Sequence, residues 1–137
     1  MLFRSPPTRL TNASARALSQ PGSAVLTAGF VIGGTGTDTL LIRGIGPCLT
    51  QFGVGGVLAT PQVLLFDSTG ASIGSNTGWG GGGTLAAAFA QVGAFALAPA
   101  SADSAMLVTL SAGNYTVEVA GTNGSSGVAL VEIYEMH

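Results

Sequence analysis

Short apolar runs, separated by clusters of glycine, serine and threonine, are the feature that most constrains the fold of this chain. The 137 residues include 22 glycines. No apolar run approaches the roughly 18 residues that a membrane-spanning helix needs. Runs of this kind with turn residues at both ends are typical of β-strands. The length suits one domain with one substantial core, so we expect a single all-β domain.

The strands are expected to pair antiparallel. Apolar runs that predict strands lie at 24–34, 39–45, 104–110, 114–121 and 127–135. The segment 61–76 predicts a hairpin, with the sequence DSTG at 67–70 as its turn. Seven or eight strands at these spacings are typical of an antiparallel β-sandwich, here of jelly-roll type.

One helix is predicted among the strands. The sequence TLAAAFAQVG at 84–93 has an apolar stripe, with Thr84 as a candidate N-cap and Gly93 as the stop. The stripe consists of Leu85, Ala88, Phe89 and Val92. We expect this helix to cover one end or an edge of the sandwich. The glycine-rich segment 78–83 leads into it as a loop anchored by Trp79.

Charge is sparse and unevenly distributed along the chain. Only 7% of the residues are charged, against about a quarter in an average soluble domain. Residues 1–23 carry three arginines and no acid (+3), whereas residues 24–137 carry one arginine and six acids (−5), which gives the net charge of −2. We interpret 1–23 as an extended N-terminal arm and 24–137 as the β-sandwich domain. A basic arm on an acidic body favours head-to-tail contact between copies, and a flexible basic tail is the alternative.

Arg43 interrupts the apolar run TLLIRGI at 39–45, on the same strand face as Leu41 and Ile45. A buried arginine needs a carboxylate or several carbonyl groups as partners. Asp67, Glu118 and Glu132 are the candidates. Three roles remain open at this point: an ion pair that fixes strand register, a pair between subunits, and a catalytic or ligand-binding arginine.

The sequence offers little support for catalysis. It has no lysine, its only cysteine is Cys48, and its only histidine is the last residue, His137. The GASIG sequence at 70–74 matches a serine-nucleophile pattern around Ser72, but it lies in a predicted hairpin and not at a strand-to-helix elbow. No metal-ligand spacing is evident, and the acidic balance argues against nucleic acid. We therefore expect no enzyme activity, no cofactor, no bound metal, no nucleic-acid partner and no membrane insertion.

Several phrases, in order, resemble a β-rich module of large secreted and surface-attached bacterial proteins. They include VLTAGFVIGG, LLIRGIGPCLTQFGV, LATPQVLLFDSTGASIGSN and GVALVEIYE. The last third, SAMLVTLSAGNYTVEVAGTNGSSGVALVEIY, is similar to pre-peptidase C-terminal-type jelly rolls. The resemblance implies a noncatalytic extracellular β-sandwich. Such modules often carry an acidic pair before the tryptophan, but the sequence NTGW at 76–79 has none, so a calcium role is not implied.

Two functions follow as hypotheses. The first is a structural subunit that self-assembles head-to-tail into an extracellular or cell-surface filament, by adding its N-terminal arm to a sheet edge of the next copy. The residues assigned to this subunit interface are Arg4, Arg9, Leu10, Arg16, Leu18, Arg43, Glu132 and Glu135. The alternative is a noncatalytic adhesive or carbohydrate-binding module that recognises a surface glycan, with Trp79 as its ligand platform. The given chain shows no signal peptide, because its first ten residues lack an apolar core.

Overall fold

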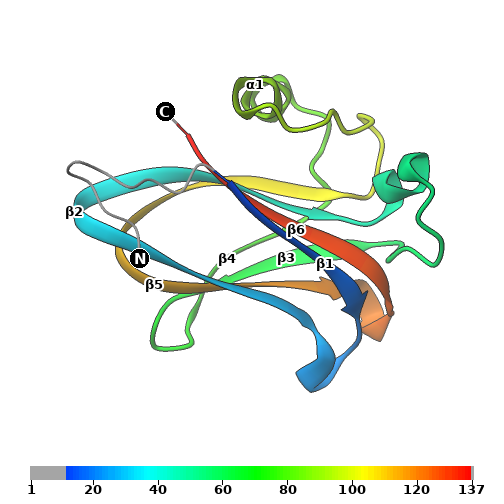
Figure 1. Cartoon of the computed structure of the whole chain (residues 1–137), viewed down its shortest axis with the longest axis horizontal. Helices are drawn as coiled ribbons and strands as arrows, with labels where there is room; N and C mark the ends of the chain where they lie inside the picture. Colours follow the sequence, from blue (N-terminus) through cyan, green and yellow to red (C-terminus); the bar gives the residue numbers. More distant parts are fainter. Residues whose placement is uncertain (1–11, 137) are drawn as a thin grey trace.

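The computed structural model describes residues 12–136, which form an all-β domain with one short helix (Figure 1). Its strands are β1 (Asn12–Ser19), β2 (Leu26–Ile45), β3 (Pro61–Phe66), β4 (Ser72–Thr77), β5 (Ser104–Gly121) and β6 (Gly127–Glu135). The helix α1 spans Gly83–Val92, and short 3-10 segments are η1 (Gly22–Ala24), η2 (Pro47–Phe52) and η3 (Thr122–Gly124). The pairings between these strands are antiparallel, in the order β1-β6-β2-β5-β3-β4.

The strands β2 and β5 are long because each bends back on itself and contributes to both layers (Figure 1). Residues 26–32 of β2 pair with 113–119 of β5, and residues 37–44 pair with 104–111. β2 bends at Gly34 and Gly36, whose φ angles of 79° and 87° favour glycine. The separate strands expected in these regions are thus the halves of two continuous strands, and the expected antiparallel β-sandwich is confirmed.

The first layer consists of β1, β6 and the halves 37–45 of β2 and 104–111 of β5. The second consists of the other halves of β2 and β5 with β3 and β4. Alternate side chains point inward between the layers. Together with Leu58, from the segment before β3, they form the main core: Leu26, Phe30, Ile32, Leu40, Ile42, Val63, Leu65, Leu110, Val117, Val119, Ala129, Val131 and Ile133.

A second core lies on the outer face of the first layer, beneath α1 (Figure 1). Its buried residues are Leu41, Ile45, Leu49, Trp79, Ala88, Phe89, Leu97, Ala105 and Tyr134. The helix therefore covers a sheet face and not an end or edge, because Leu41 and Ile45 point outward and need an apolar cover. Gly93 ends the helix at φ 75° as predicted, but the N-cap position is Gly82 and not Thr84, without a side-chain cap.

Among residues 12–136, no helix is both long enough and apolar enough to cross a bilayer.

Candidate functional site

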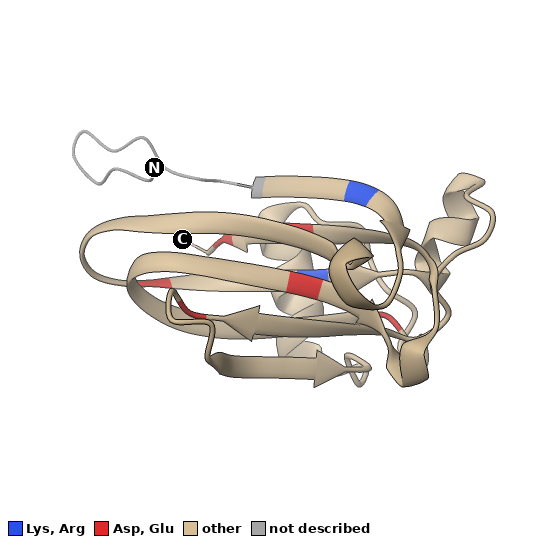
Figure 2. Cartoon of the chain, turned by 90° about the horizontal axis from the view of Figure 1, so that it is seen from below, with Lys and Arg blue, Asp and Glu red and all other residues tan. Residues whose placement is uncertain are grey.

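β1 is an edge strand that its own chain holds chiefly through the backbone. It pairs with β6 along its whole length, from Asn12 opposite Tyr134 to Ser19 opposite Gly127. The side chains of residues 13–18 are exposed. Figure 2 shows β1 along the rim of the sandwich. An exposed edge strand is a typical place for strand exchange or strand addition.

Two of the predicted interface residues, Arg16 and Leu18, lie on β1. Both are exposed, and Leu18 keeps 55% of its surface accessible. They stand opposite Leu130 and Val128 of β6, which pack partly against the second core. The predicted interface residues Arg4, Arg9 and Leu10 lie outside the described residues. The described portion of the arm therefore pairs with its own chain and presents one arginine and one leucine to solvent.

Ser19 is the one buried side chain among residues 13–19 of β1, at 1% exposed. Its hydroxyl donates a 2.7 Å hydrogen bond to the carbonyl oxygen of Val119. It also accepts a 3.0 Å bond from the amide of Leu26. Both partners belong to the second layer, so Ser19 ties the end of β1 across the sandwich.

Replacing Ser19 with alanine is expected to destabilise the domain by about 1–3 kcal/mol, since a buried donor and a buried acceptor lose their partner. Amide hydrogen exchange in β1 should accelerate more than exchange in β5. Ser14→Ala is the matched control, because Ser14 is exposed on the same strand. Equal exchange rates for β1 in the two variants would contradict the assigned anchor role.

Arg43 is enclosed between the first layer and α1, with none of its surface exposed. Its Nε donates to Oε1 of Glu132 at 2.7 Å, and its Nη1 donates to the carbonyl oxygen of Phe95 at 2.7 Å. The guanidinium carbon lies 4.7 Å from the ring centroid of Phe89 and 4.5 Å from that of Phe95. The ion pair within one chain is therefore the role that the structure gives Arg43, among the three left open by the sequence.

Glu132 receives a second hydrogen bond on its other oxygen, from the hydroxyl of Tyr134 at 3.0 Å. Burial, followed by the nearby Glu132 charge, raises the pKa of Tyr134 to about 12. Arg43, Glu132 and Glu135 are all buried, with at most 6% exposed. This corrects their assignment to a subunit interface, because their own chain already encloses them.

Trp79 is also buried, at 5% exposed, beneath α1. Its indole Nε1 donates to the carbonyl oxygen of Ala98 at 3.0 Å, and its ring packs 5.1 Å from that of Phe89. The expected anchoring of the glycine-rich loop by Trp79 is confirmed. The prediction of Trp79 as an exposed ligand platform is wrong, because the loop folds its single tryptophan under the helix.

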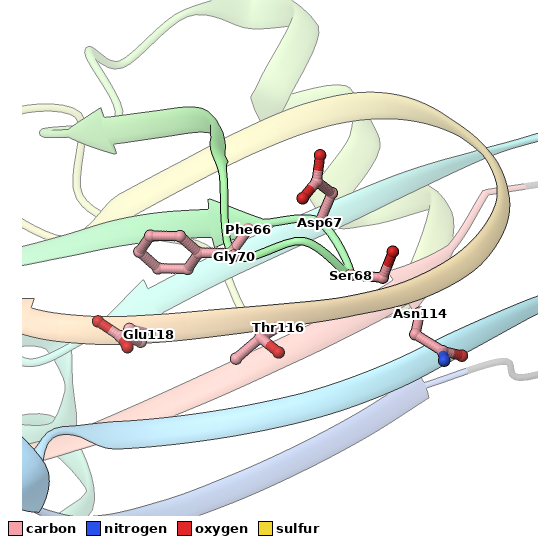
Figure 3. Close-up of a pocket in the computed structure, with 7 residues that line it drawn as sticks. All are labelled: Phe66, Asp67, Ser68, Gly70, Asn114, Thr116 and Glu118. Carbon is pink, nitrogen blue, oxygen red and sulfur yellow. The ribbon is translucent and has the colours of Figure 1, made fainter.

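A depression of about 490 Å³ lies on the outer face of the second layer (Figure 3). It is lined by Phe66, Asp67, Ser68, Gly70, Asn114, Thr116 and Glu118. Phe66 and Thr116 are directly paired on adjacent strands β3 and β5. Figure 3 shows the Phe66 ring and the Glu118 carboxylate toward one end, and Ser68 with Asn114 toward the other. The depression thus combines an aromatic ring, two carboxylates and several neutral polar groups.

This depression holds the accessible negative charge of the domain. Of the six acids in the chain, all within the described residues, four are buried. The buried acids are Asp38, Asp103, Glu132 and Glu135. The two others, Asp67 and Glu118, both line the depression. This site was not predicted from the sequence, although strand alternation in 114–121 places Glu118 and Thr116 on one face.

Asp67 closes the turn between β3 and β4. Its Oδ1 accepts bonds from the amide and hydroxyl of Thr69, at 2.9 and 2.6 Å, and from the amide of Ala71 at 3.2 Å. The bonds from Thr69 are the main reason that the pKa of Asp67 lies below its usual value. The predicted hairpin turn is confirmed, and the carboxyl stays ionised at neutral pH.

Asp103 has a different role from Asp67 and does not lie with it in a metal cluster. Its carboxylate accepts bonds from the amide of Gly46 at 2.7 Å and from that of Cys48 at 3.2 Å. No group of three or more His, Cys, Asp or Glu side chains suited to a metal ion occurs in residues 12–136.

No protein-family model and no curated protein sequence matches the chain. A crystal structure of the pre-peptidase C-terminal domain of a collagenase from Bacillus anthracis is similar, with 10% sequence identity and a TM-score of 0.48. The match covers 90% of this chain and 89% of that domain. The domain type is the one that the sequence resembles in its last third.

Proposed function

We propose that the chain is a noncatalytic structural subunit of an extracellular, cell-surface filament, assembled from copies of itself by exchange of β1. The observation that carries this proposal is the state of β1: an edge strand whose side chains at residues 13–18 are exposed. Main-chain bonds to β6 hold the strand, and a neighbouring copy can form the same bonds. The sequence-based resemblance to secreted and surface-attached bacterial modules supports the location.

Exchange costs little free energy, since each bond lost within a chain is regained between chains. The connection between β1 and β2 is short and contains η1. It includes Pro21 and Gly22, the latter at φ 77°. Rotation of this connection transfers β1 to the β6 edge of the next copy. Such a contact is heterologous, so repeated exchange extends a filament unless the angle closes a ring.

The sparse charge also supports assembly. With 7% charged residues, the chain has little of the ionic surface that keeps most soluble monomers apart. Carbohydrate binding at Trp79, the alternative from the sequence, loses its platform because Trp79 is buried. Strand exchange is therefore the function that the described geometry favours.

A cysteine pair across β1 and β6 tests the exchange. Ala15 and Val131 are directly opposite in the ladder, at a separation that a disulfide can bridge. We expect Ala15→Cys/Val131→Cys, in a full chain with Cys48→Ala, to give a ladder of covalent multimers on a non-reducing gel after assembly. Electron microscopy of the same sample should show filaments.

The matched control is Ser14→Cys/Val131→Cys in the same background. Ser14 is opposite Glu132, so its side chain points to the other face from Val131. This pair should not cross-link efficiently. If Ala15→Cys/Val131→Cys instead gives only cross-linked monomers, and no filaments appear for the unmodified chain at any concentration, strand exchange is excluded.

A further inference from the structure

We propose that the depression on the second layer is the docking site for the arginine-bearing N-terminal segment of a second copy of this chain. The inference rests on the proposed function and deepens it, because it names the surface that receives the arm's charge. Its occupant is an extended peptide with guanidinium groups, and its residues are Phe66, Asp67 and Glu118 with their polar neighbours.

The distribution of charge supports this occupant. The two acids that are not buried, Asp67 and Glu118, both lie in the depression. Among the positively charged side chains, Arg43 is buried and paired with Glu132, whereas Arg16 is exposed on β1. The remaining arginines, Arg4 and Arg9, precede β1 in the sequence. The accessible negative charge therefore lies at one site, and the arm carries every arginine except Arg43.

No cation within residues 12–136 forms an ion pair with Asp67 or Glu118. Asp67 uses one oxygen, Oδ1, to close its turn, which leaves Oδ2 available to a guanidinium group. Glu118 is partly exposed on β5. Asp67, in the turn after β3, and Glu118, on β5, both line the depression, and two carboxylates around one depression form an electrostatic target for arginine and not for another acidic surface.

The chemistry of the depression matches a site that the chain already uses for arginine. Arg43 is held by one carboxylate and by two aromatic rings within 5 Å of the guanidinium carbon. The depression offers the same two kinds of group, a phenyl ring from Phe66 and carboxylates from Asp67 and Glu118. Arginine pairs well with carboxylates and with aromatic faces. The side chains of Ser68, Asn114 and Thr116 can accept hydrogen bonds from the guanidinium or the peptide backbone.

Docking of the N-terminal segment on a neighbour and docking on the same chain are two different arrangements. The eleven residues before β1 can span up to about 38 Å when extended. The experiment must therefore separate the two arrangements. A mixture of two complementary variants does so, because only docking between copies can be restored by mixing.

The test uses full-length chains and measures the critical concentration for assembly. Glu118→Gln is expected to raise it about five-fold, and Glu118→Arg should prevent assembly. Gln51→Arg is the matched control, because it changes the net charge by the same amount as Glu118→Gln, at an exposed residue of η2. This control should assemble like the unaltered chain. Assembly of the unaltered chain should also weaken as salt is raised, since salt screens exposed charges.

The second variant reverses the charge of the segment before β1, with Arg4→Glu and Arg9→Glu in one chain. Neither this variant nor Glu118→Arg should assemble alone, and an equal mixture of the two should recover filaments of alternating subunits. If Glu118→Arg assembles as well as Gln51→Arg, docking at the depression is overturned while strand exchange still stands.

A separate titration keeps the inference testable if the unaltered chain forms no filaments. A synthetic peptide of residues 1–11, which lacks β1, is added to the full chain, and amide shifts are followed at Phe66, Thr116 and Glu118. Saturable shifts that disappear in Glu118→Gln, or with a peptide whose arginines are glutamines, support the docking site. Absence of shifts overturns it, as does a response at these residues to a polysaccharide but not to the peptide.

Discussion

Arg43→Leu is expected to destabilise the domain by about 3–5 kcal/mol, the usual cost of removing one partner from a buried ion pair. Glu132 would then keep a buried carboxylate with only the Tyr134 hydroxyl as a donor. The carbonyl oxygen of Phe95 would also lose its donor. Urea unfolding, followed by circular dichroism, measures the change.

The double variant Arg43→Leu/Glu132→Leu distinguishes the ion pair from simple packing. Replacing both members of a buried pair by apolar residues is often neutral or stabilising, so most of the lost stability should return. Arg16→Leu is the control for loss of an exposed arginine and should change stability by less than about 0.5 kcal/mol. A double variant as unstable as Arg43→Leu alone would contradict the ion-pair explanation.

The strands were predictable because alternation and turn residues are local properties. The run from 24 to 34 alternates in the sequence, and the structure buries its Leu26, Phe30 and Ile32 in the main core. The bend that joins this run to 39–45 within β2 depends on the glycines between them and on pairing with β5. Pairing between distant segments is a property of the whole fold, and a single sequence does not determine it.

The candidate site was predictable only in part, for the same reason. The sequence indicated that a buried Arg43 needs a carboxylate or several carbonyl groups, but the choice among three candidate acids depended on the β2–β6 register, which places Arg43 opposite Glu132. The depression joins Phe66 of β3 to Glu118 of β5 across a pairing that local patterns do not reveal. Trp79 was misplaced because a glycine-rich loop suggests exposure, whereas packing under α1 buries the indole.

Asp103→Ala is expected to destabilise the domain by about 3 kcal/mol, because a buried charged acceptor of two amide bonds is removed. Asp103 has no exposed surface, and its carboxylate joins the start of β5 to the amides of Gly46 and Cys48 at η2. Its carbonyl oxygen accepts a bond from the amide of Trp79 at 2.9 Å. Tryptophan fluorescence during urea unfolding should therefore measure the decrease in the free energy of unfolding.

Asp103→Asn separates the loss of charge from the loss of the acceptor. It keeps one oxygen for Gly46 and places an amide group toward Cys48, so we expect roughly half the effect of alanine. Asp67→Asn is the matched control, since Asp67 closes an exposed turn and should cost less than either change at Asp103. If Asp103→Ala unfolds at the urea concentration of Asp67→Asn, the carboxylate does not hold η2 against β5, and packing around Leu49 and Trp79 is what fixes that end of the second core.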